Sequence, residues 1–539
     1  MRDDMLLSTL QDVYKGTNVS AGNEEGCHVG TRETIITEIL DWAALEGLDV
    51  PKILWLHAMP GAGKSAIART VVDRLKRSER HSNFAADFFF RRDDIEKRTP
   101  FALWCHILFK LASRYPVFRD AALSRLRADG FDLASSKAND IVNVITNAAN
   151  SLLDKGLETG PLPVIVIDAL DECPQTSSSP VRPRDSVLEA LIRLPRQCFR
   201  VLVASRPETD IDAALRPISQ SMHLQTGTEV DNQSSLDVQR FLSASLRPYP
   251  HLQALNIKRL TEKAAGLFIW ATTAVQYLAA PGSDAEERLQ NVMDGGFGTG
   301  DLSKLYHLVL ASRFSEKPDA RIHHAFQRIV GTILAAVRPL TRIELEELLG
   351  CHESATDLEA VATADVIYVL GGLETVLLSQ TSGNGTLQFS HLSFPEFLAH
   401  EKSQTCFYGI QDSASHSYLA SRCLHAMQTR LRFNICQLPS SHYPNSHYED
   451  LSDRLDLHVS LSLRYAVQHW SFHLSKSPSS DHLLSAVTKL LDTHLLFWLE
   501  ISSLLKFIGK ASRALNAVSH WLQVRYVLFP FSHLANSAI

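Results

Sequence analysis

Residues 58–65 read Ala-Met-Pro-Gly-Ala-Gly-Lys-Ser, a spacing of glycines, lysine and serine that suits contact with phosphate oxygens. They follow the apolar run Ile53–His57 and precede an amphipathic stretch with Ile67, Val71 and Leu75 on one face. Glycines let successive backbone N–H groups turn toward an anion, and the start of the following helix adds about half a positive charge. The residues expected to bind the phosphates of a nucleoside triphosphate are Ala58, Met59, Pro60, Gly61, Ala62, Gly63, Lys64, Ser65 and Ala66.

Lys64 and Ser65 supply the charge and the hydroxyl group of this loop. We expect Lys64 to reach the β- and γ-phosphates and Ser65 to coordinate Mg²⁺. Ala58 stands where the motif has its first glycine; its methyl group costs little if φ is negative and more if φ is positive. A glycine-rich turn without a ligand is the alternative, which the lysine and serine at these offsets disfavour.

A second candidate group follows the apolar run Val164–Ile167, which delivers Asp168 to the carboxyl end of a strand. Ligands of open α/β sheets bind at that edge. A carboxylate there needs a partner, and Mg²⁺ held by Ser65 is the natural one, so Asp168 is a predicted metal ligand. Asp171 and Glu172 come directly afterwards, and either could orient or deprotonate the attacking water.

A third group ends the run Val201–Ala204, which is followed by Ser205 and Arg206. An arginine at this edge can contact a γ-phosphate and report its presence, so Arg206 is predicted to act with the two acids in catalysis. The alternative is a surface arginine that caps a strand.

The elements that must position these groups alternate between short apolar runs and amphipathic stretches. This pattern predicts a parallel sheet covered by helices on both faces. The predicted strands are Ile53–His57, Ala85–Phe90, Val164–Ile167, Val201–Ala204 and Met222–Leu224. Thr31 is predicted to cap a helix that carries Ile35, Ile36, Ile39 and Leu40.

After Thr226 the pattern becomes helical. Leu236–Ala280 predicts two or three helices, and Pro281–Gly300 predicts a linker whose glycines, 296–300, form a flexible connector and not a dinucleotide loop. Leu302–Leu349 is helical, with a break at Pro339 and a cap at Thr341. The remaining signals are a hairpin with strands Val376–Ser379 and Leu387–Ser390, which suggests a winged helix, and helices from His416 onward.

These patterns predict an α/β P-loop NTPase domain followed by a helical domain, a winged-helix domain and an all-α C-terminal region. The predicted boundaries are 1–26 for an N-terminal segment, 27–225 for the NTPase domain, 226–300 for the helical domain and linker, 301–402 for the winged helix and 403–539 for the C-terminal helices.

Composition excludes several classes of protein. The net charge of −6 over 539 residues, without a long basic run, disfavours a nucleic-acid partner. The most apolar window, Leu495–Ile508, is interrupted by Glu500 and Lys506 and is too short to span a membrane. The eight cysteines form no CxxC pair and are expected to be reduced, mostly buried thiols of a cytoplasmic protein.

His469 and His473 share a helix face, as two zinc ligands can. The neighbouring Trp470 and Phe472 favour a place in the core instead.

Together these segments resemble a NACHT domain, a branch of the STAND class of P-loop NTPases, over about residues 27–525. Besides the loop, the resemblance is carried by residues 27–32 (CHVGTR), 168–172 (DALDE), 204–207 (ASRP), 266–271 (GLFIWA, typical of fungal members) and 389–399 (FSHLSFPEFLA). It implies that Thr31 and Arg32 contact the adenine side of the nucleotide, and that His391 contacts the β-phosphate of ADP.

The resemblance further implies a strand order in which the sensor strand lies between the P-loop strand and the acidic strand. It implies a closed ADP state that a ligand and ATP open, followed by homo-oligomerisation. Relatives usually carry an effector domain before this unit and repeats after it. We expect neither within these 539 residues, and the chain would then be either a truncated gene model or a genuine short form.

Three functions remain open at this point. The first is an ATP/ADP-binding signalling switch with Mg²⁺ and slow ATP hydrolysis, of the kind used in fungal innate immunity, self/non-self recognition or programmed cell death. The second is a nucleotide-stabilised scaffold for partner proteins that does not hydrolyse ATP. The third is a processive ATPase of the related AAA type. No nucleic-acid or membrane partner is expected.

Overall fold

A computed structural model of the chain describes residues 10, 26–45, 50–77, 83–92, 94, 98–127, 131, 133, 136–153, 162–175, 182–195, 197–249, 256–280, 285–294, 301–315, 319–351, 360–379, 385–399, 408–440 and 442–528. Several predictions concern residues outside these ranges: most of the N-terminal segment 1–26, the glycine connector 296–300, the hairpin-turn residues Gly383 and Asn384, Cys406, and the chain end from 529 to 539. The described chain forms two compact units, one up to residue 308 together with 391–393, the other from 309 to 390 and from 394 onward.

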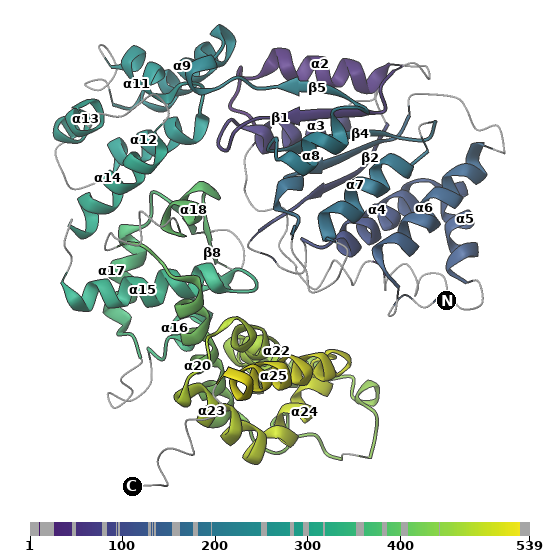
Figure 1. Ribbon diagram of the computed structural model, residues 1–539, viewed down its shortest axis with the longest axis vertical. Helices are drawn as coiled ribbons and strands as arrows, with labels where there is room; N and C mark the ends of the chain where they lie inside the picture. The colour runs from purple at the N-terminus through teal and green to yellow at the C-terminus, as the bar shows by residue number, and fades with distance from the viewer. Residues whose placement is uncertain are drawn as a thin grey trace. The chain divides into compact units, whose positions relative to one another are not determined.

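The first unit is built on a parallel sheet (Figure 1), as the alternating pattern predicts. Its strands are β1 (Ile53–His57), β2 (Phe84–Phe89), β3 (Val164–Asp168), β4 (Arg200–Ser205) and β5 (Ser219–His223). Their order is β2-β3-β4-β1-β5, so β4 lies between β1 and β3. The strand order implied by the family resemblance is confirmed.

The edge strand β5 begins earlier than predicted. The prediction missed its first residues because they are polar. The sequence predicts Met222–Leu224, whereas the strand pairs with β1 from Ser219 onward. An edge strand has one outer face in solvent, so its apolar signal is weaker than that of a central strand.

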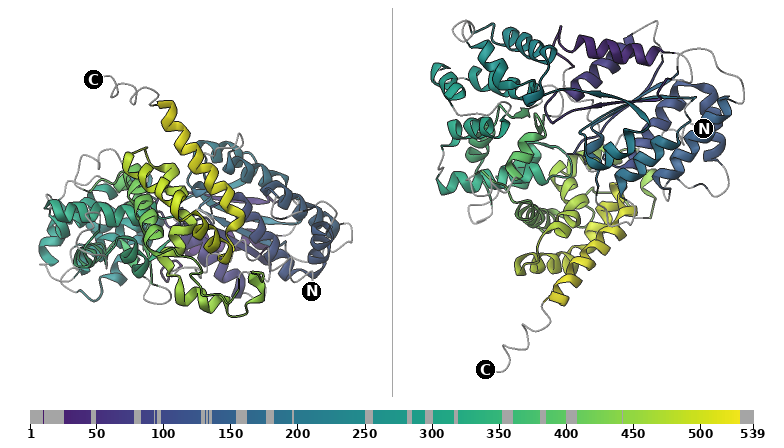
Figure 2. Two further views of the ribbon diagram at one scale, coloured as in Figure 1. Left: turned by 90° about the horizontal axis from the view of Figure 1, so that it is seen from below. Right: turned by 45° about the horizontal axis from the view of Figure 1, so that its top comes forward.

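Helices cover both faces of this sheet, and side chains of one strand alternate between two cores. Ile53 and Trp55 of β1 pack into one core, and Leu54 and Leu56 into the other. The first core is closed by α4 (Pro100–Arg114), α5 (Pro116–Leu126), α6 (Ala138–Leu153), α7 (Pro183–Arg193) and α8 (Thr209–Leu215). The second is closed by α2 (Glu33–Ala44) and α3 (Lys64–Arg77), and Figure 2 gives two further views of these layers.

Helices follow the sheet in the first unit. They are α9 (Asn232–Ser245), α11 (Ile257–Ala264), α12 (Phe268–Ala279), α13 (Ala285–Asp294) and the start of α14 (Leu302–Phe314). The predicted linker Pro281–Gly300 is wrong in part, since α13 lies inside it. Leu289, Val292 and Met293 recur at helical spacing and are buried, which stabilises this helix despite its acidic composition.

The second unit begins with helices and a small antiparallel sheet. These elements are α15 (Ala320–Ala335), β6 (Leu340–Thr341), α16 (Arg342–Leu348), α17 (Thr363–Gly372), β7 (Leu377–Ser379), β8 (Thr386–Phe389) and α18 (Ser393–Ala399). The strand order is β6-β8-β7, and the predicted hairpin is the pair β7 and β8. Thr341 caps α16 in a capping box with Glu344, as predicted for Thr341.

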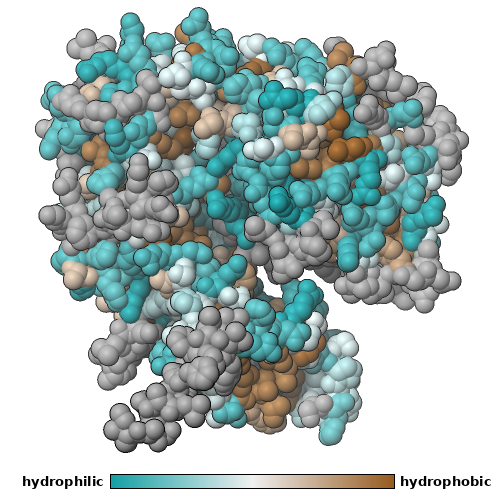
Figure 3. Space-filling model, viewed as in Figure 1, coloured by the Kyte–Doolittle hydropathy of each residue, from teal (hydrophilic) through white to brown (hydrophobic). Residues whose placement is uncertain are grey.

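The rest of the second unit is helical. It comprises α20 (Asp412–Arg430), α21 (Leu451–His458), α22 (Leu461–Lys476), α23 (Asp481–Thr493), α24 (Leu495–Leu504) and α25 (Ile508–Leu528). Some apolar side chains of this region are exposed, Leu457 at 78% and Leu496 at 77%, and Figure 3 shows apolar residues gathered over the C-terminal helices. Within the described ranges, no helix combines the length and the apolar character that crossing a bilayer requires.

Candidate nucleotide-binding site

The predicted phosphate loop lies between β1 and α3, where only glycine suits two positions. Gly61 and Gly63 have φ values of +80° and +94°. A side chain on Gly61 would also collide with Ile269 of α12, whose Cγ2 atom would lie 2.0 Å from the new Cβ. Ala58 is buried and has no positive φ, so its methyl group costs little at the position of the motif's first glycine.

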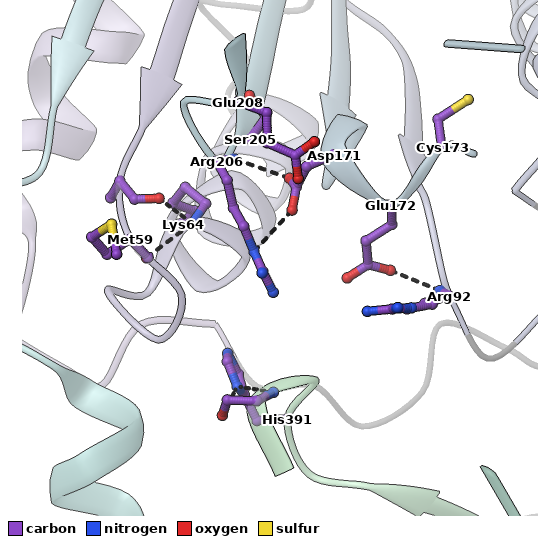
Figure 4. A network of polar contacts seen from close by, with 12 residues as sticks. Met59, Lys64, Arg92, Asp171, Glu172, Cys173, Ser205, Arg206, Glu208 and His391 are labelled. Carbon is purple, nitrogen blue, oxygen red and sulfur yellow. Dashed lines mark hydrogen bonds and ion pairs between the residues drawn. The ribbon is translucent and has the colours of Figure 1, made fainter. Parts of the chain in front are cut away.

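Lys64 opens α3 and turns back over the loop (Figure 4). Its Nζ atom donates to the carbonyl oxygens of Ala58 and Met59, at 2.9 and 3.1 Å. Burial lowers the pKa of Lys64, and the carboxylates of Asp171 and Asp168 oppose this shift. The lysine therefore lies between the carbonyl oxygens of the loop and the acidic segment 168–172.

Asp168 ends β3 and is 2% exposed. Ala169 then adopts a left-handed conformation with φ of 54°, which turns the chain into the short helix η1 (Leu170–Glu172). This turn separates the two acids that the sequence treats as equivalent. The Asp171 side chain faces the end of β4, and one carboxylate oxygen of Glu172 accepts the backbone N–H of Arg92 at 2.7 Å.

Arg206 is joined to Asp171 through two groups. Its backbone N–H donates to Oδ1 of Asp171 at 3.0 Å, and its Nε atom pairs with Oδ2 at 3.1 Å. The alternative of a solvent-facing strand cap does not describe this arginine, whose side chain is 21% exposed and ion-paired. Just before it, Ser205 accepts the indole N–H of Trp55 at 2.9 Å, which ties the end of β4 to the middle of β1.

Residues 27–32, before α2, differ from the prediction. Thr31 does not cap α2: its hydroxyl donates to the carbonyl of His28 at 2.7 Å, and Arg32, with φ of 60°, occupies the cap position. The backbone N–H of Arg32 donates to Asp237 at 3.0 Å. This long-range bond, from a residue about two hundred positions away, replaces the local cap that the sequence suggests.

The Arg32 guanidinium connects the phosphate loop with the helices after the sheet. It donates to the carbonyl of Ala62 at 3.1 Å and to the hydroxyl of Ser234 at 2.6 Å, and it lies over the Phe268 ring at 5.1 Å. The N–H of Ile269 also donates to the carbonyl of Gly61 at 3.2 Å. The sequence reasoning missed Ser234 and Asp237; only Asp237 lies within the predicted helical stretch Leu236–Ala280, where a polar residue beside apolar ones is a signal that could have found it.

His391 belongs to the first unit by its contacts, together with Leu392 and Ser393. Its Nδ1 atom accepts the backbone N–H of Ser393 at 3.1 Å, so the neutral ring carries its proton on Nε2. Burial, together with the positive charges of Lys64 and Arg206, lowers the pKa of His391 to about 4. The ring is therefore neutral at pH 7. It lies beside the loop, with its Cε1 atom 4.0 Å from where a Cβ of Gly61 would lie.

Ser65 and Asp168 have the chemistry of a Mg²⁺ site. Mg²⁺ prefers oxygen ligands, and these two residues place a hydroxyl at the start of α3 and a carboxylate at the end of β3. Ser65 is exposed, whereas Asp168 is buried, an arrangement that leaves room for water ligands on one side. No cluster of three or more His, Cys, Asp or Glu side chains that could hold a metal occurs within the described ranges.

His469 and His473 lie in the C-terminal helices and have the core role that the sequence favours. His473 is fully buried, and its two ring nitrogens bond to His416 and to the Tyr465 hydroxyl, each at 2.9 Å. The His469 ring packs on Tyr465, with ring centroids 4.8 Å apart.

Of the described cysteines, five are buried, and burial raises the thiol pKa of Cys105 and Cys173 to about 12.

Comparison with known proteins gives a family and one curated relative. Residues 30–206 match the family described as Nephrocystin 3, N-terminal. The vegetative incompatibility protein HET-E-1 of Podospora anserina is 25% identical over 511 residues, which is 88% of this chain and 35% of that protein. The chain thus spans about a third of the length of this relative.

Two solved structures are similar at a low level. The ORC2 protein of Aeropyrum pernix matches with a TM-score of 0.32 and 11% identity, over 74% of this chain and 96% of that chain. The Drosophila ORC bound to DNA matches with a TM-score of 0.28 and 14% identity, over 72% and 95%. At these values the similarity carries no argument, and the assignment rests on the family match, on HET-E-1 and on the motifs at one edge of the sheet. The family match and the similarity to HET-E-1 support the resemblance of this chain to NACHT-like P-loop NTPases of the STAND class.

Proposed function

We propose that this chain is an ATP/ADP-dependent switch that binds nucleotide with Mg²⁺ and hydrolyses ATP slowly. One observation supports this proposal most directly: Lys64, Asp171 and Arg206 lie at one edge of the sheet, with the imidazole of His391 in the same unit (Figure 4). Backbone amides and Lys64 suit the β- and γ-phosphates, Ser65 and Asp168 suit Mg²⁺, and Arg206 suits the γ-phosphate.

The two acids have different proposed roles. The Asp171 carboxylate already holds the sensor arginine through two bonds, so it positions Arg206. Glu172 lies on the same turn, where its carboxylate accepts the backbone N–H of Arg92, and we propose that it accepts a proton from the attacking water because Asp171 is committed to Arg206. Thr31 and Arg32 would line the adenine side, with Arg32 acting through its bond to Ala62.

We assign the elements from α15 to α18 to a winged-helix domain, because helices are followed there by a three-stranded antiparallel sheet. His391 follows the last strand of that sheet. Its Nε2–H would donate to the β-phosphate of ADP in a closed state, and loss of this bond would accompany opening. Homo-oligomerisation on opening, a cytoplasmic location and a role in fungal-type immunity, self/non-self recognition or cell death complete the proposal.

A scaffold that binds nucleotide without hydrolysing it is the second candidate. It is favoured by the fact that both Asp171 and Glu172 are engaged by protein groups. Mass spectrometry of nucleotide released from denatured purified protein, combined with single-turnover phosphate release from added ATP, separates the candidates. Bound ADP with slow release supports the switch; bound ATP without release supports the scaffold; a protein with neither bound nucleotide nor affinity for one would overturn both.

A further inference from the structure

Arg184 is a buried arginine near the start of α7, outside every motif considered so far. It is 3% exposed, and it follows a proline at the first position of the helix. A guanidinium group remains charged at all physiological pH values, so its burial requires close partners.

All the acceptors that the structure reports for the Arg184 side chain lie on two segments that carry site residues. On the acidic turn, Nε donates to the carbonyl of Cys173 at 3.0 Å, and Nη2 donates to the carbonyl of Asp171. On the segment after Arg206, Nη1 pairs with Glu208 at 2.5 Å and with Asp210 at 3.2 Å.

The two segments are the ends of β3 and β4, which are neighbours in the sheet but distant in the chain. Arg184 holds Asp171 by its carbonyl oxygen, and Asp171 holds Arg206 by its carboxylate. Gln175 adds a second link, because its amide donates to Glu208 at 3.0 Å and to Asp210 at 3.3 Å. The acidic turn and the sensor segment are thereby joined by two polar side chains, Arg184 and Gln175.

We propose that Arg184 is a positioning residue that sets the Asp171–Arg206 pair and so determines how well the site distinguishes a nucleoside triphosphate from a diphosphate. This inference rests on the proposed function, since it assumes that Arg206 reads the γ-phosphate. The planar guanidinium suits the task, because its fixed fork binds two backbone carbonyls and two carboxylates at once, which a lysine ammonium cannot do.

The test is the ratio of the dissociation constants for ADP and for adenosine 5′-(β,γ-imido)triphosphate, each with Mg²⁺, measured by calorimetry on the full chain. Arg206→Met should shift this ratio toward the diphosphate by about tenfold, the effect of losing a charge-assisted bond to phosphate. Arg184→Met should shift the ratio in the same direction, by roughly half as much or more on a logarithmic scale. The double variant should shift the ratio no further than Arg206→Met alone.

Arg184→Lys retains the buried charge and guards against a variant that fails to fold; it should give a shift in the same direction but smaller. Arg193→Met is the matched control, since it removes an arginine from the same helix whose side chain bonds to Asn139, away from the acidic turn. Folding of each variant is checked by circular dichroism and gel filtration at the assay temperature.

Three outcomes would overturn the inference. Arg184→Met and Arg184→Lys could weaken both nucleotides equally, the effects of Arg184→Met and Arg206→Met on the ratio could add in full, or Arg206→Met could leave the ratio unchanged. In each case wild-type protein still binds nucleotide, so nucleotide binding as proposed above survives, and only an unchanged ratio in Arg206→Met would remove the proposed γ-phosphate role of Arg206. Absence of nucleotide binding by the wild-type protein would overturn the proposed function and the inference together.

Discussion

The phosphate-loop edge (Lys64, Asp168, Asp171, Glu172 and Arg206) and the histidine cluster of the C-terminal helices both contain buried titratable groups, but they satisfy them differently. In the histidine cluster (His416, Tyr465, His469 and His473), the rings and the hydroxyl bond to one another or pack together. At the phosphate-loop edge, opposite charges arrive from separate elements, and carboxylates oppose the effect of burial on Lys64.

The comparison teaches how a binding site differs from a polar core. Burial lowers the pKa of a basic group in both regions, to about 3 for His469 and to about 4 for His391. In both regions positive or imidazole neighbours contribute to this lowering, so the neutral imidazoles are the stable forms. At the phosphate-loop edge, two glycines with positive φ and a helix start add anion-binding geometry that the cluster lacks.

The largest effect is expected in the histidine cluster at low pH. The folded pKa of His469 is depressed to about 3, so between pH 6.5 and 3 the unfolded chain binds a proton that the folded chain does not. The contribution of His469 to stability is therefore fully present above pH 6.5 and is lost as the pH falls through this window, by on the order of 5 kcal/mol in all and about 3 kcal/mol down to pH 4.5. Urea denaturation at pH 7 and pH 4.5 measures it.

His469→Leu should reduce this pH dependence, because the variant lacks the titrating ring, whereas the packing contact with Tyr465 can be made by an apolar side chain. The exposed His482 provides the control, and His482→Leu should retain the wild-type pH dependence. Equal acid sensitivity in His469→Leu and wild type would show that the cluster does not carry the effect.

The next effect in size concerns turnover at the phosphate-loop edge. Glu172→Gln should lower single-turnover phosphate release by about a hundredfold or more, the usual contribution of a general base, with nucleotide affinity nearly unchanged. Asp171→Asn should also slow release, but should in addition weaken triphosphate binding because Asp171 holds Arg206. Glu189→Gln, an exposed change on α7, is the control. Wild-type rates in Glu172→Gln would place the base elsewhere.

Lys64→Ala should weaken Mg²⁺-ATP binding at least tenfold, since a charge-assisted bond to phosphate contributes about 1.5–3 kcal/mol. Calorimetry measures this loss, and Lys76→Ala in the last turn of the same helix is a matched control, because Lys76 pairs with Asp87 at 3.5 Å. Unchanged affinity in Lys64→Ala would refute the phosphate-loop assignment and remove the difference between the two regions.

His391→Leu should have the smallest effect, a faster release of ADP by roughly tenfold with a larger open or oligomeric fraction. The reason is the loss of one Nε2–H donor to the β-phosphate. Stopped-flow release of labelled ADP and light scattering after gel filtration provide the readouts. If the variant stays monomeric and releases ADP at the wild-type rate, His391 resembles the structural histidines of the cluster.

Much of the site could be predicted because its signals are local. The strand Ile53–His57, the glycines and Lys64 are consecutive in the chain, and so are β3 and Asp168. The same holds for the Thr341 capping box and for the β7–β8 hairpin, in which pattern and turn lie within a short segment.

Sequence alone thus determined the parallel sheet, the phosphate loop and the acidic strand end, because period-2 and period-3.6 patterns act over a few residues. Tertiary structure decided which charges meet. Asp171 pairs with Arg206, and Arg184 bonds to the carbonyl of Asp171. In place of the predicted Thr31 cap, the backbone N–H of Arg32 bonds to Asp237. Each of these partners is distant in the chain, and a buried charge selects its partner by position in the folded core, which no local pattern encodes.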